Sequence, residues 1–147
     1  MNRGFLFGII FSIKVGMYTK ENHLTKVRDF NLVLKYGCWI NNQFLSLKVL
    51  ELAKKEIHFP STADVDKFKK QLKLAVNVGL KVSKKAVVRN RAKRQIVEIL
   101  REVMSKDGIS EGYYLFFVAK SNIKDKTFAE ISEEVKVLLK RAGVLSE

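Results

Sequence analysis

Several common ingredients of functional sites are scarce in this sequence. Its 147 residues include one cysteine and two histidines. Cys38 cannot form an internal disulfide, which fits a reducing cytoplasm, and we interpret it as a small buried apolar residue. His23 and His58 are isolated, so histidine and cysteine cannot assemble a metal cluster. No carboxylate cluster, histidine pair or nucleophile–base spacing is recognisable. We therefore expect no catalytic residue in the chain.

Long apolar runs are also missing. The apolar run within residues 1–16 has about ten residues, whereas a membrane-spanning helix needs roughly 20. No small-residue cleavage site of the signal-peptide kind follows it. A polar stretch typical of a protein start begins at Met17. We interpret residues 1–16 as an upstream extension or an artefact of the assigned start codon, and we expect no membrane association.

Acidic residues are outnumbered. The chain carries 28 Lys and Arg against 15 Asp and Glu, a net charge of +13, with 47% hydrophobic residues. A hydrophobic fraction of this size predicts a folded and not a disordered chain. The length suits one domain, which we place at residues 17–147. Positive charges in such excess repel one another in the folded state, so an anionic partner is expected. Nucleic acid, an anionic membrane surface and an acidic protein are the candidates.

The first half of the domain is predicted to contain one helix and two strands. Thr25 is expected to cap the helix and Gly37 to end it. Apolar residues predict strands over 41–52 and 72–83. The polar segment between them, about 53–71, is interpreted as a surface insertion that starts a short helix after its proline.

The second half is predicted to contain two helices around one strand. Helices are expected over 86–105 and 128–142, and an apolar, aromatic strand over 113–120. Thr127 begins a capping box at the last helix, and Gly143 ends that helix. The order helix-strand-strand-helix-strand-helix predicts an α/β (α+β) two-layer sandwich with a small mixed sheet and one β-α-β unit.

The helix over 86–105 has an apolar face and a basic face. The apolar side faces the sheet and carries Val88, Ala92, Ile96, Ile99 and Val103. The exposed side, with the two lysines before it, forms what we call the basic ridge: Lys84, Lys85, Arg89, Asn90, Arg91, Lys93 and Arg94. Arg101 lies on the same exposed side, farther along the helix.

A solvated charged face is the commonest explanation of such a run, and two features argue against it. A solvated face usually alternates both signs, whereas the first acid here is Glu98, beyond the ridge. Cations near a helix N-terminus also oppose the helix dipole. A phosphate backbone compensates both effects. Asn90 is the only amide in the ridge, which favours phosphate contacts and a structured RNA over sequence reading in DNA.

The stretch "AVVRNRAKRQI" resembles the signature of the bacterial ribonuclease P protein component. Its Arg-Asn-Arg triplet is matched by Arg89, Asn90 and Arg91, and the following Lys-Arg by Lys93 and Arg94. Other stretches are similar to the family's first helix, first and last strands and closing helix: "LTKVRDFNLVLKYG", "QFLSLKVL", "YYLFFVAK" and "FAEISEEVKVLLKR". The resemblance covers about residues 23–141, apart from the insertion.

The resemblance implies a basic subunit that assists a catalytic RNA. The ribonuclease P RNA subunit and precursor tRNA would be its partners, with no membrane and no protein partner required. The complex would remove the 5′ leader in the cytoplasm, with Mg²⁺ bound mainly by RNA activating the water. The protein alone is expected to be inactive.

The resemblance also implies two RNA-binding surfaces. The basic ridge with Arg101 would contact RNA. A cleft between the first helix and the sheet would hold the leader, lined by Phe30, Leu34, Leu45, Leu47, Lys81, Lys93 and Ala119. Phe30 is open to two interpretations, a base-stacking ring or a core residue. Leu34 and Leu47 stand where many members carry aromatic residues, and the register of Lys81, Lys84 and Lys85 against the family stays open.

The sequence leaves three rival functions open. A ribosomal-type or RNA-chaperone protein would show the same ridge but no dependence on tRNA leaders. A membrane-surface protein would use the apolar N-terminal run, although the ridge lies some 70 residues away from it. A stand-alone nuclease comes last, because the chain shows no catalytic motif.

Overall fold

The computed structural model describes residues 22–53 and 69–145. The proposed extension at residues 1–16 lies outside the described residues, as does most of the 53–71 insertion with its expected short helix. The described elements are, in chain order, α1 (Val27–Tyr36), β1 (Cys38–Asn41), β2 (Leu45–Glu51), β3 (Leu72–Asn77), α3 (Ala86–Lys106), β4 (Tyr113–Ala119), the 3-10 helix η3 (Ser121–Asp125) and α4 (Phe128–Ala142).

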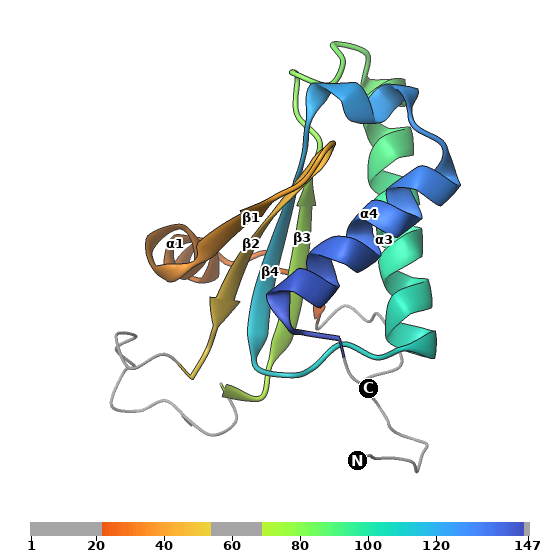
Figure 1. Ribbon diagram of the computed structural model, residues 1–147. Helices are drawn as coiled ribbons and strands as arrows, with labels where there is room; N and C mark the ends of the chain where they lie inside the picture. Colours follow the sequence, from red (N-terminus) through yellow and green to blue (C-terminus); the bar gives the residue numbers. More distant parts are fainter. Residues whose placement is uncertain (1–21, 54–68, 146–147) are drawn as a thin grey trace.

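The strands form one mixed sheet with the order β1-β2-β4-β3. Strands β1, β2 and β4 pair antiparallel, whereas β3 and β4 pair parallel around α3. The predicted β-α-β unit and the α+β sandwich are thereby confirmed. In Figure 1, α3 and α4 lie together on one side of the sheet and α1 lies on the other.

The two faces of the sheet have separate cores. The core under α3 and α4 contains Leu45, Leu47, Leu115 and Phe117 with the apolar side of α3. The smaller core under α1 contains Val33, Leu50, Leu52 and Tyr114. Because side chains alternate along a strand, each residue of β2 and β4 is assigned to one face by its position. This alternation decides which side chains can meet α1.

Strand β1 was not predicted. Its four residues are exposed or half-buried, so they lack the alternating apolar pattern that marks a strand. They pair with β2 across a short turn, which places Cys38 opposite Val49 and Trp39 opposite Lys48. Cys38 is exposed, so its interpretation as a buried residue is wrong. The expected strand over 41–52 is in fact the turn and second strand of a hairpin.

Helix α1 differs from the prediction at its start. The residue before the helix is Lys26, which gives no side-chain cap, so the predicted Thr25 cap is wrong. Gly37 ends the helix, as expected. A Cβ atom at Gly37 would lie 2.5 Å from the Val33 carbonyl oxygen, so only glycine lets β1 leave α1 this closely.

Helix α4 follows the prediction closely. Thr127 and Glu130 form the capping box, and Gly143 ends the helix with a φ of 73°. The Thr127 backbone N–H hydrogen bond lowers the pKa of the Glu130 carboxyl. Farther along, the buried Glu134 carboxylate accepts hydrogen bonds from the backbone N–H groups of Phe44 and Leu45. Helix α4 therefore fixes the β1–β2 turn.

Candidate nucleic-acid interface

The basic ridge lies on the solvent side of α3. Ala92, Ile96, Ile99 and Val103 are buried against the sheet, as predicted, and Val88 is half-buried. All ridge residues are exposed except Arg89, which is half-buried. The ridge side chains therefore project from a helix whose other face is anchored in the core.

The ridge cations have no acidic partners among the described residues. The Arg89 guanidinium donates to the Ser83 carbonyl oxygen at 3.0 Å, which ties the first turn of the helix to the preceding loop. Arg101 differs from the ridge, because it pairs with Glu98 at 3.3 Å. Uncompensated positive charge is thus concentrated at the N-terminal half of α3.

The N-terminus of α3 adds to this charge. Lys85 precedes the helix without giving a side-chain cap, and no acid lies in the first turn. The first backbone N–H groups of the helix thus lack the side-chain acceptor that usually satisfies them, and the helix dipole adds partial positive charge there. The end of the helix that carries the ridge is arranged to receive an anion.

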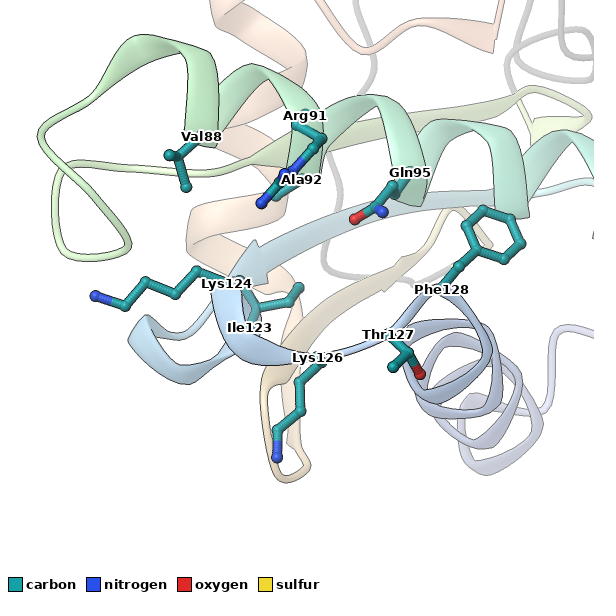
Figure 2. A pocket seen from close by; sticks show the side chains of 9 residues that line it. All are labelled: Val88, Arg91, Ala92, Gln95, Ile123, Lys124, Lys126, Thr127 and Phe128. Carbon is teal, nitrogen blue, oxygen red and sulfur yellow. The ribbon is translucent and has the colours of Figure 1, made fainter.

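A pocket of about 260 Å³ adjoins the ridge. It lies between α3 and the segment from η3 to the start of α4, and it is lined by Val88, Arg91, Ala92, Gln95, Ile123, Lys124, Lys126, Thr127 and Phe128. Figure 2 shows Arg91 and Gln95 reaching from α3 toward this segment, with Lys124 extending outward. The Lys126 amine lies 5.4 Å from the centre of the Phe44 ring. Lys124 thus continues the positive charge of the ridge beyond α3.

The predicted leader-binding set is divided by the structure. Leu45, Leu47 and Ala119 belong to the core under α3 and α4, on the face of the sheet away from α1. Their exposures of 0%, 0% and 7% leave no room for RNA, so their placement beside α1 is wrong. The error is one of strand alternation: their neighbours, such as Ser46 and Lys48, occupy the other face. Lys81 is exposed in the loop before α3, and Lys93 belongs to the basic ridge.

Phe30 and Leu34 do lie on α1, as predicted. The Phe30 ring meets the Phe116 ring edge-on, with centroids 5.6 Å apart and planes at 84°. Phe30 is half-buried and packs against the smaller core, so the core interpretation holds in part and base stacking stays a prediction. Leu34 is 53% exposed. Both side chains therefore belong to the α1 side of the sheet.

Two lysines on this side are held by the protein itself. The Lys48 side chain is buried, and its Nζ donates to the Leu34 carbonyl oxygen at 2.8 Å. Lys73 Nζ lies 3.4 Å from the carboxylate of Asp29, whose side chain is fully buried. Burial, with Asp29 nearby, raises the pKa of the Tyr114 hydroxyl, which donates to the Gln71 side chain and stays protonated.

We define the α1 surface as Phe30, Leu34, Trp39, Lys48 and Phe116.

Sequence analysis missed the lysines of the strands and the Trp39 ring. Lys48 and Lys73 each interrupt an apolar run, and strict period-two alternation would have assigned them to one face. Trp39 lies on the unpredicted strand β1. Lys124 belongs to a short polar connection and gives no periodic signal.

Among residues 22–53 and 69–145, no three His, Cys, Asp or Glu side chains gather as a metal site. No helix in the same ranges is long and apolar enough to cross a membrane. A projecting ridge of exposed cations on a small α+β sandwich is typical of the class of nucleic-acid-binding proteins, because exposed lysine and arginine side chains suit phosphate contacts.

Comparisons with known proteins identify the family. The model of the family described as Ribonuclease P matches residues 18–143. A ribonuclease P protein component of Clostridium novyi is 37% identical over 128 residues, which cover 85% of this chain and 96% of the relative. One from Clostridium botulinum is 34% identical over 125 residues, which cover 85% and 97%. The chain belongs to the ribonuclease P protein component family, which works with an RNA subunit in tRNA 5′-leader processing.

Solved structures agree on the fold. The RNase P protein of Staphylococcus aureus gives a TM-score of 0.65 at 24% identity, covering 86% of this chain and all of its own. The RNase P protein of Thermotoga maritima gives 0.61 at 23% identity, covering 81% and 96%. At these identities the likeness concerns the arrangement of helices and strands.

Proposed function

We propose that this chain binds both the ribonuclease P RNA and the 5′ leader of precursor tRNA, in the cytoplasm, while the RNA subunit carries catalysis. The observation that supports this most is the basic ridge. All of its cations except the half-buried Arg89 are exposed. None has an acidic partner among the described residues, and they lie around a helix N-terminus without a side-chain cap. Such an array gains free energy by releasing counterions from a phosphate backbone.

Each partner is assigned to one surface. The basic ridge, continued by Lys124, suits the phosphates of a folded RNA subunit, because its cations have no acidic partner among the described residues. The α1 surface suits single-stranded RNA, because Phe30 and Phe116 offer partly exposed rings that can stack on bases. This assignment requires the leader to be unpaired where it lies on the α1 surface.

Mg²⁺ is proposed to be held by the RNA subunit, where it would activate the attacking water. The described residues of the protein do not fit a metal, because no group of three possible ligands gathers there. We therefore derive no catalytic step through the protein. Its contribution is to position RNA and to supply positive charge.

Reconstitution tests this proposal directly. The purified protein is combined with the RNA subunit of the same bacterium at low Mg²⁺, and cleavage is measured on precursor tRNA. We expect no cleavage by the protein alone, slow cleavage by the RNA and faster cleavage by both. Efficient Mg²⁺-dependent cleavage without RNA would overturn the assignment of catalysis. A ribosomal-type or chaperone function predicts no acceleration that depends on the leader.

Phe30→Leu tests the leader assignment. The substitution keeps an apolar side chain against Phe116 but removes the flat ring, so we expect precursor tRNA to bind the reconstituted complex about five-fold more weakly. Binding of mature tRNA, which has no leader, is expected to stay unchanged. An equal loss for both RNAs would show that Phe30 acts through the fold.

A further inference from the structure

Trp39 is a large aromatic side chain that no interaction in the core requires. It lies on the edge strand β1 and is 48% exposed. Its register partner is Lys48, so it lies on the same face of the sheet as α1. A half-exposed indole on an edge strand is a candidate for contact with a ligand.

The protein fixes this ring beside α1. Lys48 Nζ lies 5.2 Å from the centre of the Trp39 ring, within the range of a cation–π interaction. The same nitrogen donates to the Leu34 carbonyl oxygen in the last turns of α1. One buried amine therefore contacts both the Trp39 ring and the Leu34 carbonyl oxygen, which places the ring near the C-terminal end of α1. A ring held in this way loses little conformational entropy when a base stacks on it.

The Trp39 ring lies close to a residue of α1, Leu34, that has no aromatic ring of its own. Leu34 stands where the family resemblance leads one to expect an aromatic residue, and leucine cannot offer a flat π-face to a base. Leu47, the other such position, is buried on the opposite face of the sheet. Trp39, five positions after Leu34 in sequence, supplies a flat side chain near the C-terminal end of α1.

The surroundings favour RNA as the occupant. The chain carries a net charge of +13, so a second copy docking on this edge would be repelled. Helix α1 also carries exposed cations: Lys26 precedes the helix, and Lys35 lies in its last turn, with its Nζ 5.2 Å from the Tyr36 ring. Positive charge beside a stacking ring is the combination that binds single-stranded nucleic acid.

We propose that Trp39 stacks on a base of the single-stranded 5′ leader and extends the leader-binding surface from α1 onto β1. This inference rests on the proposed function, since it assumes that the leader lies on the α1 surface. It assigns to Trp39 the stacking role that Leu34 does not fill. The leader would then cross Phe30 and Trp39 in turn, on either side of Leu34.

Tryptophan fluorescence provides the test, because the chain contains a single tryptophan. The reconstituted complex is titrated with precursor tRNA and, separately, with mature tRNA, under selective indole excitation. We expect quenching with precursor tRNA alone, because stacking brings a base onto the ring. Equal quenching by mature tRNA, or full quenching by the RNA subunit before substrate is added, would overturn the proposal.

Two substitutions complete the experiment. Trp39→Leu removes the flat ring and is expected to weaken precursor tRNA binding about five-fold with mature tRNA unaffected. Trp39→Phe keeps a flat ring and is expected to retain most of the affinity. If Phe30→Leu shows a leader-dependent loss while both Trp39 variants bind normally, the Trp39 proposal fails and the leader assignment stands. If precursor and mature tRNA bind the unaltered complex equally, the leader assignment itself fails.

Discussion

The basic ridge and the α1 surface both carry lysine or arginine, yet they use charge in opposite ways. On the ridge, Arg91, Lys93 and Arg94 are exposed and have no acidic partner among the described residues. On the α1 side, Lys48 and Lys73 are bound to a carbonyl oxygen and a buried carboxylate of the protein itself. The exposed cations of the ridge are available to a partner, whereas Lys48 and Lys73 are engaged within the fold, and Lys48 also lies over the Trp39 ring.

This difference shows that counting cations does not identify a binding surface. A lysine bound within the fold contributes to stability, and it has little left to offer a phosphate. An exposed arginine contributes almost nothing to stability and much to salt-dependent binding. Substitutions of lysines held within the fold should therefore lower stability, whereas substitutions of exposed ridge cations should change the salt dependence of binding.

The largest effect is expected at Lys73. Lys73→Met removes the amine beside the fully buried Asp29 carboxylate and leaves only Arg28, at 3.6 Å, near that charge. Breaking a buried ion pair is costly, so we expect the free energy of unfolding to fall by about 2–3 kcal/mol. Urea denaturation measures this change.

Lys136→Met is the matched control for Lys73→Met. Lys136 is exposed on α4, and its loss should change stability by less than about 0.5 kcal/mol. The salt dependence of RNA-subunit binding should be the same in both variants. A normal stability for Lys73→Met would contradict the structural use of charge on the α1 side.

The next effect concerns the ridge. The double variant Arg91→Ala and Arg94→Ala should unfold at the same urea concentration as the parent protein, because both side chains are exposed. It should bind the RNA subunit on the order of ten-fold more weakly. The slope of log affinity against log salt should become shallower by about 1.5–2, one contact for each arginine. An unchanged slope would mean that these arginines are merely solvated.

The ridge could be predicted from sequence because all its information is local. A single helix fixes which residues face the core and which face solvent, so Ala92 and Ile96 determine where Arg91 and Arg94 point. The capping box at Thr127 is local in the same sense. Such features depend only on residues three or four positions apart.

The α1 surface could not be predicted in this way, because it is made of residues from different elements. A shift of one residue along a strand moves a side chain to the other face, which is how Leu45 and Leu47 were assigned to the wrong side. Trp39 reaches the surface only through the pairing of β1 with β2. That pairing is set by a turn held by Glu134 on α4, about 90 residues away in sequence.

The smallest effect is expected at the edge of the ridge, where Lys124 and Lys126 provide a matched pair. Both line the pocket beside Arg91, but the Lys126 amine lies over the Phe44 ring while Lys124 is exposed. Lys124→Ala should weaken RNA-subunit binding about two- to five-fold and make the salt slope shallower by up to about one. Lys126→Ala should change the slope less, because its charge is already engaged by the protein. Filter binding at several salt concentrations measures both, and equal slopes for the two variants would show that proximity to the ridge, and not freedom of the charge, decides which lysines meet RNA.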